Sequence, residues 1–365
     1  MLRLLTCLLI VSCCSIQMTA QPVSQPLPAA PPQKAGYPPS FFTRLNKQLA
    51  DSIPCLGSFI VWKHNAIIYE SYFHGATEQT SFDIKSITKS VVSAIAGVAS
   101  AKNLLPALDK RVMDFFPEYA ASRHAPLVWF ADEKEKNDNM RNQVTLRDLL
   151  TMQPGFEWSD FGPVVNAFIN ASDPVRFTLE LPFADTPGKR FVYCSAAASV
   201  FCAALAKSLP MDIKSFAETN LFTPAGMSLQ RWDTDAAGRY VGASEMYMIP
   251  RDLLRFGLLY LHHGKAGEKQ LIPAEWIKAS TDKQATLNYW DILPHVNGYG
   301  YFWWRRKTNG HQAFIASGAG GQLVAVVPDL DMVVVGTCFL NEGNRGREEI
   351  RRLQLFLDKI TLIKQ

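Results

Sequence analysis

The sequence predicts an α/β fold of the α+β kind, in which helices flank an antiparallel sheet and a mainly helical region is inserted. Short apolar runs typical of strands occur at 58–70 and again at 298–335, towards the two ends of the chain. Between them, roughly from 105 to 215, helical patterns dominate. We therefore expect strands from both ends to form one sheet, with the helical region as an insertion.

The first third of the folded part carries four element signals. Residues 40–53 have apolar positions at helical spacing, which predicts an amphipathic helix. Two strand-like runs follow at 58–62 and 66–70, and the three residues between them predict a hairpin. After Lys89, residues 90–100 are small or apolar on nearly every face. This is typical of a helix that is buried on all sides.

The middle of the chain is predicted to be helical. Thr145 and Asp148 open one segment in a pattern like a capping box. Residues 124–142 are irregular and largely charged, which predicts a surface insertion. Helices are expected at 109–116, 144–152 and 196–209, and from Pro250 and Pro273 onward.

The last third of the chain is richer in strand-forming residues. Strands are expected at 298–304, 312–315, 322–327 and 332–335, followed by a closing helix at about 348–360. The sequence shows no internal repeat.

The composition is that of an ordinary globular protein. Of 365 residues, 48% are hydrophobic and 19% are charged, which is enough apolar material for a large core. The formal net charge of +4 is small and is not gathered into long runs. Nucleic acid is therefore not an expected partner.

The N-terminus has the pattern of a secretory signal. A positive charge at residue 3 precedes a mostly apolar run at 4–11, which is too short to span a bilayer. We expect 1–20 to be a signal peptide, 21–39 a disordered tether and 40–365 the folded domain, in an exported, periplasmic protein. Cleavage after residue 20 competes with a lipoprotein-type box, which would leave Cys13 as a lipid anchor.

The cysteines predict neither a disulfide framework nor a metal site. Outside the leader they are scattered singly, mostly in apolar surroundings where a buried free thiol is the usual finding. They are Cys55, Cys194, Cys202 and Cys338. His262 and His263 are adjacent rather than four apart, so a zinc hydrolase is a weak alternative and no cofactor is expected.

Ser86 and Lys89 stand at the start of the predicted buried helix. A spacing of three places their side chains on one face, within reach of each other. A lysine can remove the proton of a serine hydroxyl if desolvation lowers the lysine pKa, and a buried helix start provides desolvation. A second Ser-x-x-Lys copy, Ser280 to Lys283, has polar neighbours and is interpreted as solvated surface.

Two further segments carry groups that acyl transfer needs. Tyr193, just after a Pro-Gly turn and two residues before Ser195, offers a phenol that can carry a proton. The glycine-rich run 316–322 enters a strand, where a backbone N–H can stabilise an oxyanion. Taken alone, Tyr193 fits a structural role and the glycine run fits a plain turn.

In this order, the segments resemble the penicillin-recognising serine hydrolase superfamily. The motifs are Ser-x-x-Lys at Ser86, Tyr-x-Ser at Tyr193 and a degenerate x-x-Gly ending at Gly318. The likeness extends over about 40–360 and is nearest the class C β-lactamase-like branch of esterases and 6-aminohexanoate-dimer-hydrolase-like amidases. It implies a β-lactamase/transpeptidase-like fold.

The resemblance also implies roles for individual residues. Ser86 would be acylated while Lys89 and Tyr193 manage its proton, and Ser195 would supply a supporting hydrogen bond. The oxyanion would be held by the N–H groups of Ser86 and Ala319, or by a donor nearer Gln322 if the register of the glycine run is shifted. Gly318 and Gly320 would let the backbone approach the substrate.

Ala316 departs from the family pattern, because lactamases and carboxypeptidases carry a lysine there that helps to bind a substrate carboxylate. Losing that contact, about 1.5–3 kcal/mol, favours a small-molecule or peptide-like ester or amide without a carboxylate at that point. A β-lactamase, a D,D-peptidase and a non-catalytic envelope binding protein of the same fold are the alternatives. Aromatic residues that would line an acyl pocket or pack in the core are Trp158, Tyr289, Trp290, Tyr301, Trp303 and Trp304. The oligomeric state stays open.

Overall fold

The computed structural model describes residues 26–119, 137–287, 295–340 and 347–362. The predicted signal segment with Cys13, the first residues of the tether, and Tyr289 and Trp290 lie outside these ranges. Most of the predicted insertion at 124–142 does so too, and residues 137–141 at its end are helical.

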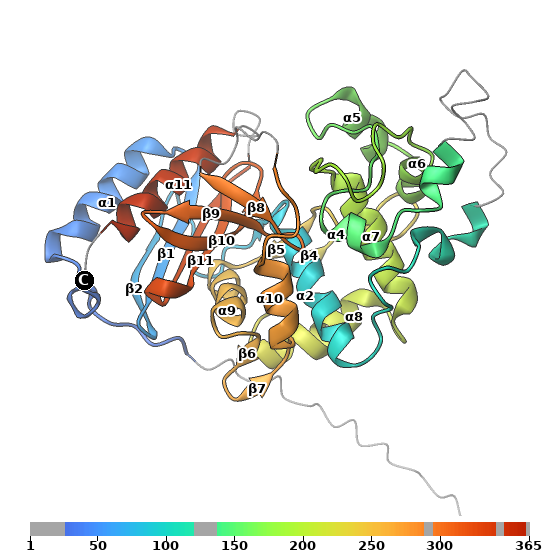
Figure 1. Ribbon diagram of the computed structural model, residues 1–365. Helices are drawn as coiled ribbons and strands as arrows, with labels where there is room; N and C mark the ends of the chain where they lie inside the picture. The colour runs from blue at the N-terminus through green and yellow to red at the C-terminus, as the bar shows by residue number, and fades with distance from the viewer. Residues whose placement is uncertain (1–25, 120–136, 288–294, 341–346, 363–365) are drawn as a thin grey trace, which may run out of the picture.

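A seven-stranded antiparallel sheet forms the centre of the molecule (Figure 1). The N-terminal hairpin pairs with the last strand, so that Phe59 lies opposite Gly336 and Val61 opposite Val334. Strands from both ends of the chain therefore build one sheet, which confirms the predicted fold class. The spatial order is β2 (Ala66–Tyr72), β1 (Leu56–Lys63), β12 (Met332–Cys338), β11 (Gln322–Val327), β10 (His311–Gly318), β9 (Trp304–Thr308) and β8 (Val296–Tyr299).

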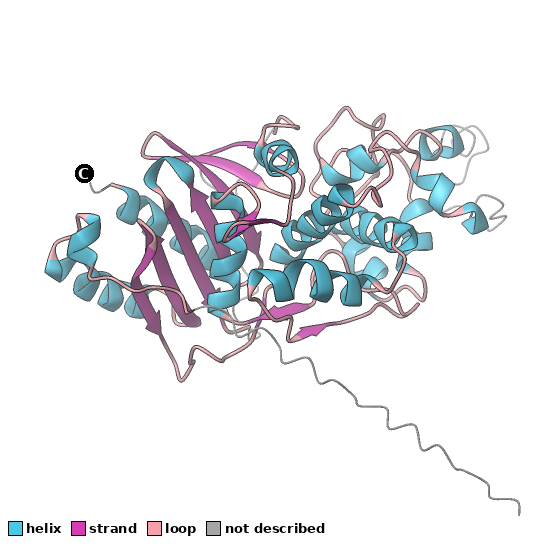
Figure 2. Ribbon diagram, turned by 90° about the horizontal axis from the view of Figure 1, so that it is seen from below, coloured by secondary structure: helices cyan, strands magenta, loops and turns pink. Residues whose placement is uncertain are grey.

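Helices cover both faces of this sheet. The amphipathic helices α1 (Pro39–Ser52) and α11 (Glu348–Thr361) lie side by side on one face (Figures 1 and 2). The other face is covered by α2 (Ile87–Ala101) and α9 (Pro250–Leu261), and α10 (Ala274–Thr281) packs against α2. The sheet is thus the middle layer of three.

The inserted region lies to one side of the sheet in Figure 1. Its helices are α4 (Leu146–Leu150), α5 (Pro163–Ile169), α6 (Pro174–Leu179), α7 (Ser195–Ser208) and α8 (Ile213–Ala217). Thr145 caps α4 in the predicted capping box with Asp148. Two smaller sheets complete the fold. One consists of β3 (Phe82–Asp83), β5 (Met246–Met248) and β4 (Arg231–Trp232), and the other, β6 (Lys265–Ala266) with β7 (Lys269–Gln270), lies between α9 and α10 in the chain.

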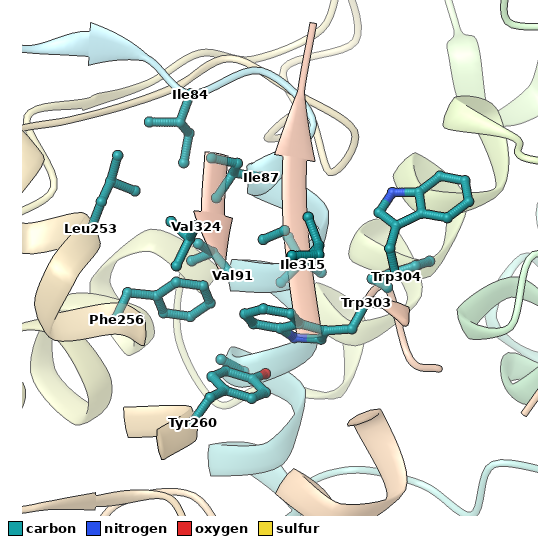
Figure 3. Close-up of a cluster of buried hydrophobic side chains, with 14 of the residues drawn as sticks. Ile84, Ile87, Val91, Leu253, Phe256, Tyr260, Trp303, Trp304, Ile315 and Val324 are labelled. Atoms are coloured by element: carbon teal, nitrogen blue, oxygen red, sulfur yellow. The ribbon is translucent and has the colours of Figure 1, made fainter. Parts of the chain in front are cut away.

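The core between α2, α9 and the sheet supports the residues that precede α2. Figure 3 shows side chains from α2, α9, β10 and β11 converging there, and the labelled ones named next are fully buried or nearly so. They include Ile84, Ile87, Val91, Phe256, Tyr260, Trp303, Ile315 and Val324. Because such cores are close-packed, the start of α2 is held firmly against the sheet.

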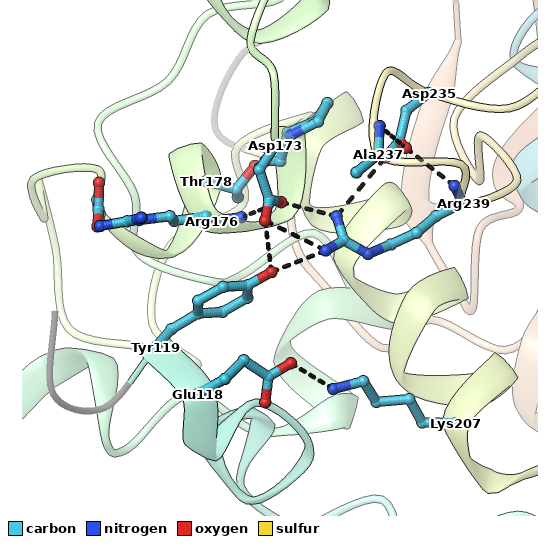
Figure 4. A network of polar contacts seen from close by, with 11 residues as sticks. Glu118, Tyr119, Asp173, Arg176, Thr178, Lys207, Asp235, Ala237 and Arg239 are labelled. Carbon is cyan, nitrogen blue, oxygen red and sulfur yellow. Dashed lines mark hydrogen bonds and ion pairs between the residues drawn. The ribbon is translucent and has the colours of Figure 1, made fainter.

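The helical region is tied together by an ion pair (Figure 4). Arg239 donates to both oxygens of Asp173, at 2.7 and 3.2 Å, and also to the Tyr119 hydroxyl, which itself donates to Asp173 at 2.5 Å. Burial opposes ionisation here, but the hydrogen bonds from Arg239 and Tyr119 lower the pKa of Asp173 to about 2. The loop before β5 is thereby joined to the start of α6.

Residues 26–39 correct the prediction of a disordered tether. The Ile67 N–H donates to the Pro28 carbonyl at 2.8 Å, and the Ala30 N–H donates back to the Ile67 carbonyl at 3.0 Å. Tyr37 is 2% exposed, and its hydroxyl donates to the carbonyl of Ile360 at 3.1 Å. A proline-rich segment can lie extended along an edge strand such as β2, pairing through its carbonyls and its non-proline N–H groups.

Two element predictions are also wrong in detail. A turn splits the expected strand 298–304 into β8 and β9. At this turn the backbone of Gly300 passes so close to the Ser280 carbonyl oxygen that an added Cβ would lie 2.0 Å from it, and Phe302 adopts a left-handed φ of 62°. The expected helix 109–116 is only a 3₁₀ turn at Val112–Phe115. The Val112 N–H donates to the Val144 carbonyl at 2.8 Å, which draws the preceding backbone into an extended bridge.

The four described cysteines are buried thiols, in agreement with the apolar surroundings expected for most of them. Among the described residues, no single helix has the length and apolar character to cross a membrane, and only α7 taken with 213–225, at an 81° bend, meets both criteria as a pair.

Candidate active site

The site is built around the turn that precedes α2. The Ile84 N–H donates to the Met246 carbonyl at 2.9 Å, which fixes this turn to β5. Lys85 has a φ of 48°, in the left-handed region, and its ammonium is 2.6 Å from the Asp83 carboxylate. Ser86 follows as the N-cap residue of α2, without using its side chain as a cap. Its hydroxyl is therefore available for other partners.

Lys89 lies one turn into α2 and is only 1% exposed. Its Nζ donates to the Ser86 Oγ at 2.9 Å, to the Ser195 Oγ at 3.1 Å and to the Ala243 carbonyl at 2.9 Å. Burial lowers the pKa of Lys89 to about 8, although the negative charge of Asp160 and the Cys194 side chain act in the opposite direction. A neutral amine, the form that can accept a proton, is thus available near pH 8.

The segment that leads into α7 positions Tyr193. The Val192 N–H donates to the Met152 carbonyl at 2.8 Å, and the Tyr193 ring stacks on Trp304 with centroids 5.2 Å apart. Lys89 Nζ lies 5.0 Å from the centroid of the same ring. Burial and the charge of Asp160 raise the pKa of Tyr193, while a side-chain hydrogen bond with Ser86 lowers it. The structure thus brings Ser86, Lys89 and Tyr193 together, with the phenol kept protonated at neutral pH.

The end of β10 lies directly beside the Ser86 turn. A Cβ built on Gly318 would lie 2.4 Å from the Ile84 carbonyl oxygen and 3.0 Å from the Lys85 Cβ, so only glycine allows this approach. Ala319 follows and is exposed. Within the described residues, the N–H groups of Ser86 and Ala319 donate to no other group. Two free donors on adjacent segments are what an oxyanion site needs.

Of the remaining predicted residues, Ser195 contacts Lys89, whereas Gly320 and Gln322 shape the turn after β10. Ser195, at the start of α7, contacts Lys89 as described above. Gly320, with a φ of 75°, forms the turn after β10 and is buried. Gln322 is fully buried, and its side-chain amide binds the backbone C=O and N–H of Cys338 at 2.8 and 3.3 Å. Gln322 therefore holds the turn between β10 and β11 against β12.

Asp160 belongs to the site but was not found from the sequence. Its carboxylate accepts hydrogen bonds from the Ser195 Oγ at 2.6 Å, from the Ser195 N–H at 3.0 Å and from the Trp158 indole. It lies in a loop between α4 and α5, with no fixed spacing to Tyr193 or Ser86. The nearest sequence signal is Trp158, for which the sequence predicts either a place in the wall of an acyl pocket or packing in the core.

Other patterns in the sequence have structural roles. Ser280 is buried and donates to the Trp276 and Ile277 carbonyls of α10, which corrects its interpretation as solvated surface. Lys283 is exposed and is not among its partners. Trp303 is fully buried, with its ring centroid 4.2 Å from that of Tyr260, and so packs in the core. No cluster of three metal-ligating side chains occurs in the described ranges.

The pKa of Lys89 predicts how activity depends on pH. Because only the neutral amine can remove the Ser86 proton, acylation is expected to rise about tenfold per pH unit below about pH 8 and to level off above it. The measurement is kcat/KM for a neutral p-nitrophenyl ester between pH 5.5 and 10 at constant ionic strength. A rate that stays flat across pH 6–9 would contradict the assignment of Lys89 as the base.

The three-layered fold with a serine, a lysine and a tyrosine in contact defines the class as serine hydrolases of the class C-like β-lactamase fold. The profile of the Beta-lactamase family matches residues 43–359, and the chain belongs to this family. A search of curated proteins gave no match.

Solved structures with the same fold include hydrolases of several kinds. One described as a 6-aminohexanoate-dimer hydrolase from Bacillus anthracis is 19% identical, with a TM-score of 0.68 over 87% of this chain and 81% of that one. EstCE1, a hydrolase with promiscuous acyltransferase activity, is 16% identical, with a TM-score of 0.68 over 87% and 96%. A D-stereospecific amidohydrolase from Streptomyces sp. is 16% identical, with a TM-score of 0.59 over 81% and 92%. At these identities the similarity shows the fold alone.

Proposed function

We propose that the protein is a serine hydrolase that forms an acyl-enzyme at Ser86 and cleaves an ester or an amide. The observation that carries the proposal is the contact of one hydroxyl, that of Ser86, with both a buried amine and a buried phenol. Each group matches a need of acyl transfer: a nucleophile, a base whose pKa is lowered by burial, and a proton carrier.

The proposed reaction has two halves. Neutral Lys89 takes the Ser86 proton as Oγ attacks the substrate carbonyl, and the N–H groups of Ser86 and Ala319 stabilise the oxyanion. The proton returns through the Lys89 and Tyr193 pair to the leaving alcohol or amine, which departs as the acyl-enzyme forms. Water then attacks the acyl group, its proton passes to the same pair, and Ser86 is released with a carboxylic acid as product.

We also propose that the preferred substrate lacks a carboxylate next to the scissile bond. Position 316 is alanine, 1% exposed, so the strand beside Ser86 offers no cation there. The nearby ammonium of Lys85 is already paired with Asp83 and Glu245, at 2.6 and 3.4 Å. We further propose that the protein is exported to the periplasm, with or without a lipid on Cys13.

A substrate panel tests the function. Wild type and Ser86→Ala would be compared on p-nitrophenyl acetate and butyrate, on short linear amides and on nitrocefin, which carries a carboxylate. We expect wild type to hydrolyse the neutral esters with kcat/KM at least about tenfold above that for nitrocefin, and Ser86→Ala to hydrolyse none of them. Faster turnover of nitrocefin would favour a β-lactamase, and no turnover of any substrate by wild type would favour a binding protein.

A further inference from the structure

The Asp160 carboxylate is held in one orientation beside the Ser86 site. Both of its oxygens are used: Oδ1 accepts from the Ser195 N–H at 3.0 Å and from the Trp158 indole, and Oδ2 accepts from the Ser195 hydroxyl at 2.6 Å. Trp158 is buried and Asp160 itself is partly buried. A carboxylate bound by three donors stays where the fold places it.

Ser195 connects this carboxylate to Lys89. Its hydroxyl has a single hydrogen, which is donated to Asp160, so the same oxygen must accept from the Lys89 Nζ at 3.1 Å. The Ala243 carbonyl accepts a second Lys89 hydrogen at 2.9 Å. These two acceptors leave the third position on Nζ directed at the Ser86 Oγ, 2.9 Å away. The hydrogen bonds thus aim the base at the nucleophile.

The other groups around Lys89 carry no charge at neutral pH. They are the hydroxyls of Ser86 and Ser195, the Ala243 carbonyl, the Tyr193 phenol and the Cys194 thiol. Burial, followed by the charge of Asp160, raises the pKa of both Tyr193 and Cys194, which keeps both protonated. Among the described residues, Asp160 is therefore the anion whose charge raises the pKa of Lys89.

We infer that Asp160 is a positioning residue that acts on Lys89 through Ser195, as the aspartate of a Ser-His-Asp triad acts on its histidine. When the proton moves from Ser86 Oγ to Lys89 Nζ, an ammonium forms in a buried site, and the carboxylate that Ser195 and Trp158 hold in place stabilises it. This inference rests on the proposed function and extends the Ser86, Lys89 and Tyr193 group by Ser195 and Asp160.

The test uses neutral probes, so that a contact between Asp160 and a charged substrate cannot produce the effect. The rate of Ser86 labelling by a neutral fluorophosphonate and the kcat and KM for p-nitrophenyl acetate would be measured from pH 5.5 to 10. The variants are Asp160→Asn, Ser195→Ala and the double variant. Glu157→Gln is the control, because Glu157 is exposed in the same loop and carries the same charge.

For Asp160→Asn we expect kcat to fall about 10- to 100-fold with KM within about twofold. The rising limb of the pH profile should move to lower pH, because the charge that raises the Lys89 pKa is gone. Ser195→Ala should lose a similar factor in kcat, and the double variant should be within about threefold of Ser195→Ala, since both residues act along one path. Glu157→Gln should match wild type.

Two results would overturn the inference. The first is an Asp160→Asn protein whose kcat and rising pH limb are both unchanged. The second is an Asp160→Asn protein that loses kcat while its pH limb stays in place and its loss adds to that of Ser195→Ala in the double variant. A purely structural role would give this second result. If Asp160→Asn does not fold, as judged by thermal unfolding, Ser195→Ala decides instead, and an unchanged kcat in that variant would overturn the inference. Failure of the proposed function looks different, because wild type itself would then take no label at any pH.

Discussion

Lys89→Met is expected to lower kcat/KM about 10⁴-fold or more, to the level of Ser86→Ala, while the protein still folds. The methionine has a similar length but cannot accept the Ser86 proton, so the nucleophile loses its base. Hydrolysis of p-nitrophenyl acetate and fluorophosphonate labelling measure the loss. Lys102→Met, at the exposed end of the same helix, is the matched control and should keep wild-type activity. Activity of Lys89→Met within tenfold of wild type would remove Lys89 from the mechanism.

The same variant should alter how stability depends on pH. The pKa of Lys89 is about 8 in the folded chain and 10.5 as the reference value, so between these values the unfolded chain binds more protons. Wild type should therefore become more stable as pH rises through this window, by about 2–4 kcal/mol relative to Lys89→Met. Urea unfolding of both proteins at pH 7.5 and 10 gives the difference. Parallel changes in the two proteins would contradict the lowered pKa.

Gly318→Ala is expected to lower kcat about 10²- to 10³-fold, the usual effect of losing one oxyanion donor. The added Cβ would lie 2.4 Å from the Ile84 carbonyl oxygen, so the end of β10 must move away from the Ser86 turn. The N–H of Ala319 then no longer points at the same oxygen as the N–H of Ser86. The measurement is kcat for a neutral ester, with the thermal midpoint as a check on folding.

Gly298→Ala is the matched control for this substitution. Gly298 lies in β8 of the same sheet, and the three atoms nearest to a Cβ built there all belong to the exposed Lys283 side chain rather than to backbone. We expect the control to keep kcat within about twofold of wild type. If Gly318→Ala behaves like this control, the end of β10 does not contribute an oxyanion donor.

The fold was largely predictable because its signals are local. Alternating and continuous apolar runs mark β1, β11 and β12, and Thr145 with Asp148 marks the start of α4. The errors arose where distant contacts decide the backbone. The turn at Gly300 depends on the Ser280 carbonyl, and the order of residues 26–39 depends on pairing with Ile67. No pattern in the neighbouring sequence predicts either of these contacts.

The site was predictable to the extent that helix geometry and motif order specify it. A spacing of three puts Ser86 and Lys89 together, and the structure confirms that they touch. The role of Tyr193 was predicted from the order of the motifs along the chain, not from the residues around it in the sequence. Asp160 was missed because a carboxylate on a loop has no periodicity that relates it to Ser195. The pKa of Lys89 likewise depends on burial by segments far along the chain.

The role of Ser86 as the nucleophile is tested most directly by mass spectrometry of the intact protein after incubation with a fluorophosphonate, followed by a digest that locates the adduct. Wild type should gain the mass of one phosphonyl group on the peptide containing Ser86, faster at pH 8.5 than at pH 6, and Ser86→Ala should gain none. An unmodified wild-type protein, or an adduct on a residue other than Ser86, would contradict this mechanism.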